Sequence, residues 1–209
     1  MTLVGKLHAS SVFPRRVRRL AELIAGMLPE NASVLDIGSG DGSIDALIMS
    51  KRSDVRIAGV DVLIRPETKV PTRQFDGRHI PFNDRSFDVA MFVDVLHHTD
   101  CSQDLLREAN RVSKQGVLIK DHFLNGALSK TILRFMDYVG NAHHAVRLPY
   151  NYISPEEWTV LYRTAGLRPI RTVSKLHLYP WPASLVFDDG LHFLTMLQKT
   201  PGMGRQATV

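Results

Sequence analysis

Three glycines at alternate positions, Gly38, Gly40 and Gly42, follow the largely apolar stretch 34–37. Glycine adopts backbone conformations that other residues resist, and it lets a ligand lie against the bare main chain. A helical pattern begins directly afterwards at Ser43, and the start of a helix offers free N–H groups and the positive end of the helix dipole. A strand, a glycine turn and a helix in this order predict a nucleotide-sized binding cradle.

The spacing around this turn restricts the kind of nucleotide site. A P-loop is excluded because no Gly-Lys-Ser/Thr closes the turn. A dinucleotide site requires Gly-x-Gly-x-x-Gly/Ala, and Ser43 occupies the third position of that pattern. Asp61 lies about 20 residues beyond the turn, where an acid binds ribose hydroxyls in either remaining kind of site. The turn alone therefore does not name its ligand.

Alternating strand and helix patterns position this turn. Strands are expected at 33–37, 55–61, 72–75, 87–93, 116–120, 168–177 and 190–198, and helices at 15–28, 43–52, 102–112 and 154–166. The alternation predicts a mostly parallel α/β sheet with helices on both faces. Residues 1–30 are expected to form an N-terminal lid and helix. The stretch 123–153, with a helix-like piece at 127–139, is the predicted substrate lid.

Length and composition indicate one domain of an ordinary globular kind. The 209 residues contain no internal repeat and no linker, so a single domain spanning 1–209 is expected. No apolar run approaches the ~20 residues of a membrane span, and no apolar signal core precedes the first basic cluster. Cys101 is the only cysteine, which excludes an intrachain disulfide and favours a reducing, cytoplasmic setting.

Much of the net charge of +5 is concentrated near the start of the chain. Four arginines, at positions 15, 16, 18 and 19, lie on and beside the polar face of the helix predicted at 15–28. A solvated helix face is the simpler interpretation, and contact with an acidic substrate or an anionic membrane surface is the alternative. The rest of the chain is close to charge balance, which disfavours a nucleic-acid-binding stripe.

Two further stretches complete a pattern with the glycine turn. The strand ending on Asp61 is one, and the segment 75–98, with its Phe-Asp-Gly, Ser-Phe-Asp and Val-Leu-His-His motifs, is the other. Together with 34–42, they closely resemble the class I S-adenosylmethionine-dependent methyltransferases, in the branch that methylates small molecules, quinones and lipids. The resemblance covers 33–122 well and the later strands loosely. It implies a Rossmann-like, doubly wound, mostly parallel seven-stranded sheet with an antiparallel last strand.

The resemblance also assigns eight positions to the cofactor. The methionine end falls to Asp36, Gly38, Gly40 and Asp94, the ribose hydroxyls to Asp61, and adenine to Val62, Asp76 and Gly77. All lie at the carboxyl ends of strands, where open α/β sheets bind ligands. Local roles stay open for three of them: Asp61 as a turn acid, Asp76 in an Asp-Gly turn, and Asp94 as the N-cap of a helix at 95–99.

Two adjacent histidines are the candidate catalytic residues. Methyl transfer requires in-line placement and exclusion of water, and an oxygen or nitrogen nucleophile also needs a base. His98 is the first candidate because it lies four residues past Asp94, an arrangement similar to that in phosphoethanolamine methyltransferases. His97 is the second candidate. The alternative for both is a packing and hydrogen-bonding role.

Other residues around the expected pocket receive roles from topology alone. His122 follows the fifth strand, with Asp121 beside it as an orienting group, and Tyr150 and Tyr152 are placed to cover the substrate. No metal is expected. The adjacent pairs 97–98 and 143–144 point about 100° apart on a helix, and the chain has no cysteine cluster and no His-Glu-x-x-His.

The expected function is methyl transfer to an oxygen, nitrogen or carbon of a small-molecule or lipid-like acceptor, with S-adenosylhomocysteine as product. Nucleic-acid substrates are disfavoured. Asp-Val-Leu-His replaces the Asn/Asp-Pro-Pro-Tyr/Phe stretch of amino-group base methyltransferases, and Cys101 alone does not match the cysteine-dependent RNA enzymes. The alternative is an accessory subunit that binds the cofactor without turnover.

Overall fold

The computed structural model describes residues 13–124, 129–134, 151–187 and 190–201. Seven strands form one sheet in the order β3-β2-β1-β4-β5-β7-β6. Their bounds are β1 Ser33–Ile37, β2 Arg56–Asp61, β3 Thr72–Gln74, β4 Phe87–Val93, β5 Ser113–His122, β6 Leu167–Val173 and β7 His192–Lys199. The helices that lie within the described residues include α2 Phe13–Ala25, α3 Ser43–Lys51, α4 Ser102–Val112, α6 Pro155–Thr164 and α7 Ser184–Phe187, with the 3₁₀ helix η2 at Leu96–His98.

The sheet has the predicted topology. Strand β1 pairs in parallel with both β2 and β4, and β4 pairs in parallel with β5. Strand β7 runs antiparallel to both of its neighbours, β5 and β6. The doubly wound sheet with an antiparallel last strand is thus confirmed, and the carboxyl ends of β1, β2, β4 and β5 meet at one edge together with the beginning of β7.

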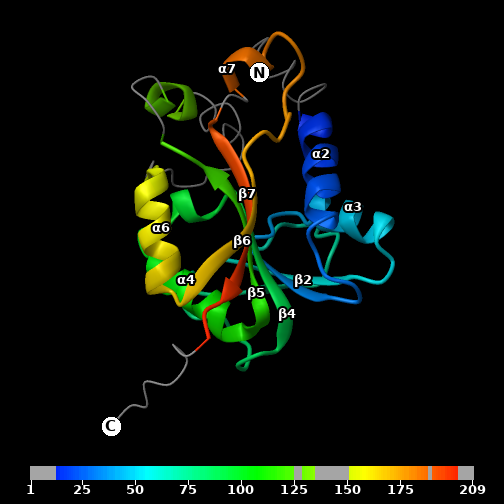
Figure 1. The fold of residues 1–209 in the computed structure, drawn as a ribbon. Coiled ribbons are helices and arrows are strands. Elements are labelled where there is room, and N and C mark those ends of the chain that lie inside the picture. The colour runs from blue at the N-terminus through cyan, green and yellow to red at the C-terminus, as the bar shows by residue number, and fades with distance from the viewer. Residues whose placement is uncertain (1–12, 125–128, 135–150, 188–189, 202–209) are drawn as a thin grey trace.

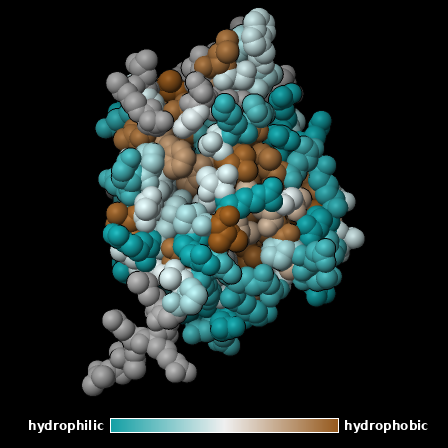
Figure 2. Space-filling model, viewed as in Figure 1, coloured by the Kyte–Doolittle hydropathy of each residue, from teal (hydrophilic) through white to brown (hydrophobic). Residues whose placement is uncertain are grey.

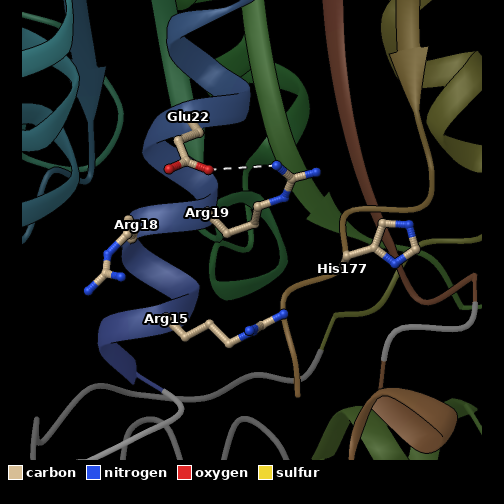
Figure 3. A pocket seen from close by; sticks show the side chains of 5 residues that line it. All are labelled: Arg15, Arg18, Arg19, Glu22 and His177. Carbon is tan, nitrogen blue, oxygen red and sulfur yellow. Dashed lines mark ion pairs between the residues drawn. The ribbon is translucent and has the colours of Figure 1, made fainter. Parts of the chain in front are cut away.

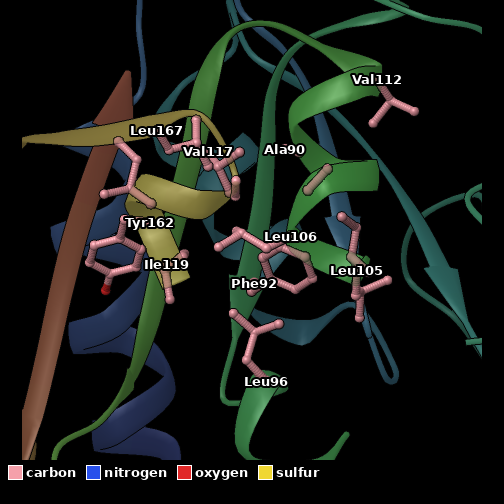
Figure 4. Close-up of a cluster of buried hydrophobic side chains, with 14 of the residues drawn as sticks. Ala90, Phe92, Leu96, Leu105, Leu106, Val112, Val117, Ile119, Tyr162 and Leu167 are labelled. Carbon is pink, nitrogen blue, oxygen red and sulfur yellow. The ribbon is translucent and has the colours of Figure 1, made fainter. Parts of the chain in front are cut away.

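Helices cover both faces of the sheet, as Figure 1 shows. On one face, α4 and α6 pack through side chains such as Leu106 and Tyr162 against Phe92 and Ile119 (Figure 4). On the other face, α2 and α3 pack on a second cluster that includes Ile24. Because both faces are buried, the inner strands are continuous apolar runs rather than alternating ones.

Local signals explain how α6 begins and ends. The Ser154 side chain accepts a hydrogen bond from the Glu157 backbone N–H, and Glu157 accepts one from the Ser154 N–H in return, while Pro155 takes the first helical position. Gly166 follows the helix with φ of +71°. The predicted helix start and stop are both confirmed.

The segment after β6 differs from the prediction. The strand ends at Val173 rather than near 177, because Leu176 and Leu178 turn away and are fully buried against α2. The Arg19 Nε donates to the carbonyl of Leu176 at 3.2 Å. The short helix α7 follows, and no sequence pattern predicted it.

The insertion predicted at 123–153 is described only in part. Its ends meet, since the Leu124 N–H donates to the Ile153 carbonyl at 3.0 Å, and residues 129–134 are helical. The remainder of the predicted helix-like piece, Tyr150 and the 143–144 histidine pair lie outside the described residues. So does the N-terminal part of the predicted lid at 1–12. In the part of the chain that is described, no helix is long and apolar enough to cross a membrane.

Candidate active site

The glycine turn leaves one side of its main chain open. Gly38, Gly40 and Gly42 have φ of +82°, +59° and +71°, in the left-handed region that glycine adopts freely. The Gly38 N–H donates to the Val60 carbonyl at 2.7 Å, which ties the turn to β2. A side chain at Gly38 would collide with Val95, whereas no atom lies within 4 Å of the position that a Cβ on Gly40 would take. The open backbone at Gly40 fits a ligand that lies on the turn.

Asp61, at the end of β2, bridges this turn and the following loop. Its Oδ2 accepts from the Gly40 N–H at 2.8 Å, and its Oδ1 accepts from the Leu63 N–H at 2.9 Å. The turn-acid role is therefore present. A carboxylate has about four acceptor sites, so it retains capacity for hydroxyl donors, and the expected ribose contact is compatible with this geometry.

An exposed apolar ledge follows Asp61. Val62 is 55% exposed, and Leu63 and Ile64 beside it are also exposed. Gly77 lies against the ledge: a Cβ there would be 3.1 Å from Val62 Cγ1. The residues expected to contact adenine, Val62 and Gly77, are therefore brought together from two separate loops.

Asp76 serves its own turn. Its Oδ1 accepts from the backbone N–H groups of Arg78 and His79 at 2.8 and 2.7 Å. These hydrogen bonds, with the His79 side chain, hold the pKa of Asp76 at about 2. The Asp-Gly turn alternative is thus realised, and the adenine contact stays an expectation.

Two carboxyls are buried together beneath the glycine turn. Asp36, in β1, is only 4% exposed, and Asp45, in the first turn of α3, is fully buried. Asp36 Oδ1 and both Asp45 carboxylate oxygens have no hydrogen-bond partner among the described residues. Burial raises the pKa of both groups, for Asp45 to about 7, and repulsion from Asp45 and Asp61 raises that of Asp36 further. Such a pair fits a cationic ligand end.

Sequence reasoning missed Asp45. An acid in the first turn of a helix is ordinarily read as an exposed group that complements the helix dipole. The apolar residues around it, Ile44, Leu47 and Ile48, gave no sign that position 45 faces the sheet.

Asp94, at the end of β4, is the centre of an ion-pair cluster. It pairs with Arg16 of α2 and with Lys120 of β5. Burial alone would raise the pKa of Asp94, but these two cations hold it well below its usual range. The N-cap alternative is wrong, because Val95 occupies the N-cap of η2 and makes no side-chain cap. The solvated-face interpretation also fails for Arg16, which points inward.

The cluster continues into the sheet through residues that the sequence analysis did not single out. Lys120 is fully buried, and its Nζ lies 3.2 Å from His192 Nδ1 at the start of β7. Burial lowers the pKa of Lys120, which Asp94 opposes, and burial and Lys120 together hold the pKa of His192 well below its usual range. A lysine directly after the apolar run 117–119 of a buried strand was the available signal.

His97 is held by Asp121, which lies 24 residues further along the chain. His97 Nδ1 and Asp121 Oδ1 are 2.6 Å apart and buried. The same carboxylate accepts from the backbone N–H groups of Leu96 and His122. The expected partner, the His122 ring, lies further away at 3.4 Å. Asp121 therefore orients His97 more closely than His122.

The other predicted residues lie around this pair. The His98 ring is 3.8 Å from the His97 ring between centroids, and Tyr152 stacks near His97 at 6.0 Å. The site thus brings together both candidate bases and one of the two candidate tyrosines at the carboxyl ends of β4 and β5.

Three ligand-type atoms, from His97, Asp121 and His122, lie within 4.8 Å of one another. Two donors of a tetrahedral zinc ion, each at 2.0–2.1 Å, would lie about 3.3 Å apart. The 2.6 Å contact between His97 and Asp121 is shorter than that, and the Lys120 ammonium adds positive charge nearby. This geometry favours a hydrogen-bonded pair over a metal site.

Comparison with known proteins places the chain. A family model described as a methyltransferase domain matches residues 9–172, well over half of the sequence. The chain belongs to this methyltransferase-domain family. The fold and the resemblance identified from the glycine turn agree with that membership.

Two curated relatives of this chain have the names of small-molecule methyltransferases. The 27-O-demethylrifamycin SV methyltransferase of Amycolatopsis mediterranei is 30% identical over 122 residues, covering 51% of this chain and 44% of the relative. The demethylmenaquinone methyltransferase of Thermotoga maritima is 31% identical over 105 residues, covering 47% and 45%. The matched part of this methyltransferase-domain chain thus spans under half the length of either relative.

A solved structure supports the fold of this methyltransferase domain. The Burkholderia thailandensis 1,6-didemethyltoxoflavin-N1-methyltransferase, determined with bound 1,6-didemethyltoxoflavin and S-adenosylhomocysteine, has a TM-score of 0.58 at 21% identity, covering 88% of this chain and 78% of that chain.

Proposed function

We propose that this protein transfers a methyl group from S-adenosylmethionine to an oxygen, nitrogen or carbon of a small-molecule or lipid-like acceptor, with S-adenosylhomocysteine as product. Family membership and the names of the curated relatives support the reaction class. The observation that carries the proposal is the open backbone at Gly40, whose N–H is bound by Asp61, in the turn that follows the buried Asp36 and precedes the buried Asp45.

The cofactor, when bound, supplies an electrophilic methyl group on a sulfonium. Gly38 and Gly40 would leave room for its methionine end, and the Asp36 carboxyl would face the cationic part of that end. Asp61 would accept from ribose hydroxyls. Val62 and Gly77 would pack on adenine, with Asp76 beside them.

His97 is the better placed base in this proposal, ahead of His98. Its Nδ1 lies 2.6 Å from Asp121. If Nδ1 carries the proton and donates it to the carboxylate, Nε2 becomes the proton-accepting atom. A buried carboxylate also stabilises the imidazolium that forms when the base is protonated. Asp94 would remain ion-paired and orient the β4 end rather than exchange a proton.

The acceptor and the setting of the protein belong to the same proposal. The insertion 123–153 would select the acceptor, because both of its ends meet beside the His97 site. Nucleic acid is not the proposed substrate. A cytoplasmic location and contact of residues 15–28 with an acidic partner are proposed with it.

Ligand-induced thermal stabilisation tests the cofactor site. S-adenosylhomocysteine at 100 times its Kd should stabilise the protein by about 2.7 kcal/mol, seen as a rise in Tm. Asp61→Ala should retain the fold and lose most of that rise. Asp104→Ala, at an exposed acid on α4, is the matched control and should keep it. Absence of any shift with either form of the cofactor at millimolar concentration would contradict the proposal.

Turnover is tested by incubating the protein with labelled S-adenosylmethionine and pools of phenol, amine, quinone and lipid acceptors. Label in an acceptor supports the enzyme. Cofactor binding without product from any pool would instead indicate an accessory subunit.

A further inference from the structure

Helix α2 presents its arginines in two directions. Arg16 points inward to Asp94, whereas Arg15, Arg18 and Arg19 line a cavity of about 320 Å³ on the outside, together with Glu22 and His177 (Figure 3). Glu22 is shared between Arg19 at 3.6 Å and Lys51 at 3.4 Å. The guanidinium groups of Arg15 and Arg18 form no ion pair with any described residue. The cavity therefore carries uncompensated positive charge.

The segment after β6 adds exposed apolar side chains beside this charge. Buried Leu176 and Leu178 fasten the segment to α2, which holds His177 next to the arginines. Trp181 follows four residues later, within about 14 Å along the chain, and is 80% exposed. Leu185 of α7 is 69% exposed, and Figure 2 shows apolar surface over α7. Large exposed apolar groups of this kind mark interaction sites.

The combination fits a lipid surface better than a nucleic acid. Tryptophan favours the membrane–water interface because its ring is apolar and its N–H is polar. Arginines beside it are attracted to anionic headgroups. Four of the net positive charges come from the arginines at 15, 16, 18 and 19, and the rest of the chain is close to charge balance, which disfavours a basic stripe along the body.

This surface lies at the same end as the candidate active site. Figure 1 shows α7 and the start of α2 beyond the end of β5 and the beginning of β7. The first turns of α2 supply both Arg16, which reaches Asp94, and Arg15, which lines the outer cavity. A membrane held there would lie at the end of the sheet that carries the candidate active site.

We propose that Arg15, Arg18, Arg19, His177, Trp181 and Leu185 form a docking surface for an anionic lipid membrane. The surface places the protein so that a lipid-like acceptor reaches the site directly from the bilayer. The second statement rests on the proposed methyl transfer, while docking itself does not.

Trp181 provides a direct readout. The chain has two tryptophans, and the other, Trp158, is 1% exposed with its indole N–H donating to the His122 carbonyl. Vesicles of equal parts phosphatidylcholine and phosphatidylglycerol should shift the emission to the blue and sediment the protein. Pure phosphatidylcholine vesicles should do neither, and added salt should weaken the binding. Trp181→Phe should lose the emission shift.

Charge reversal separates a specific surface from net charge. Arg15→Glu with Arg18→Glu should weaken anionic-vesicle binding by about tenfold or more. The matched control, Arg56→Glu with Arg163→Glu, changes exposed arginines on β2 and α6 by the same net charge and should bind nearly as the unaltered protein does. Circular dichroism melts establish that both variants fold.

Several outcomes overturn the proposal: no binding to anionic vesicles, equal weakening in the control, or a Trp181 shift produced by an RNA oligomer and not by vesicles. The assay contains no cofactor. Vesicle binding without any stabilisation by S-adenosylhomocysteine would contradict the proposed methyl transfer and support the docking surface. Stabilisation by S-adenosylhomocysteine without vesicle binding would contradict the docking surface and support the cofactor site.

Discussion

Two buried aspartates illustrate what a single partner does to a carboxyl. Asp45 and Asp121 are both fully buried. Burial raises the pKa of Asp45 to about 7, because no cation lies beside it and the neighbouring Asp36 carboxyl offsets only part of the cost of burial. Burial acts on Asp121 as well, but His97 and the His122 ring hold its pKa below the usual range. Desolvation is common to both residues, and the partner decides the charge state.

Asp45 should make the protein less stable as the pH rises. Its pKa is near 3.9 in an unfolded chain and about 7 when folded, so stability present at low pH is lost as the pH rises from about 4 through 7. Asp45→Asn should remove this dependence, gaining about 2 to 3 kcal/mol relative to the unaltered protein between pH 5 and pH 8. Urea unfolding at the two values measures it. Asp104→Asn, at an exposed acid on α4, is the control, and parallel profiles for Asp45→Asn and the unaltered protein would refute the expectation.

Asp121 should act on the reaction through His97. Asp121→Asn keeps the shape of the side chain but favours the other tautomer of the imidazole, so product formation should fall by about 10²- to 10⁴-fold. Stabilisation by S-adenosylhomocysteine should be retained, since Asp121 is not among the residues proposed to hold the cofactor. The comparison with His98→Asn decides between the bases: an active Asp121→Asn variant beside an inactive His98→Asn variant would assign the role to His98.

At the scale of elements, α2 and α6 show how much a helix owes to its surroundings. Helix α6 begins where the local capping box and Pro155 predict that it begins. Helix α2 has its apolar side on the sheet, as its periodicity predicts, yet one of its four arginines lies inside a charged cluster. Arg16 is the arginine that turns inward because it pairs with Asp94, which is 78 residues away along the chain.

Ser154→Ala should destabilise the protein by about 1 kcal/mol, because it removes the acceptor for the Glu157 N–H at the start of α6. The free energy of unfolding in urea measures the change. Thr159→Ala, in the same helix, is the control: its hydroxyl bonds only to the Pro155 carbonyl, and we expect a change within about 0.5 kcal/mol. Equal effects of the two substitutions would show that the cap has no special role.

At the scale of the whole molecule, the sheet gathers charge at one edge. Strands β4, β5 and β7 bring Asp94, Lys120, Asp121, His122 and His192 together, although they come from three separate parts of the sequence. Two of these histidines are buried and neutral: burial first, and Lys120 second, lowers the pKa of each. The arrangement makes global stability sensitive to acid.

His192 should contribute to acid destabilisation. Its folded pKa is depressed, so the unfolded chain takes up a proton below about pH 6.5 while the folded one does not. Stability is therefore lost as the pH falls from 6.5 toward the folded pKa, by up to about 1.4 kcal/mol per pH unit. His192→Asn should flatten this slope between pH 6.5 and 5.5 in urea unfolding. His79→Asn, at an exposed histidine, should leave it unchanged; an unaltered slope in His192→Asn would contradict the expectation.

The order of strands and helices could be predicted because its causes are local. A strand buried on both faces must be apolar along its buried part, as 89–93 is, and a helix that packs on a sheet must repeat its apolar residues at helical spacing. The glycine turn and the Ser154 cap are likewise each specified by a few consecutive residues. By contrast, β6 ends where it does because Leu176 and Leu178 pack against α2. The short helix α7 has no periodic apolar pattern that would have predicted it.

The sequence by itself determined the α/β topology, the cradle at Gly38–Gly42 and the class of ligand that it predicts, since each follows from neighbouring residues. Only the tertiary structure decided which charges meet. Arg16 with Asp94, His97 with Asp121, and Asp45 with Asp36 are contacts between separate elements. Their pairing depends on strand register and helix rotation, which no local pattern contains. Packing of α3 on the sheet thus brings the carboxyls of Asp36 and Asp45 together beside the glycine turn.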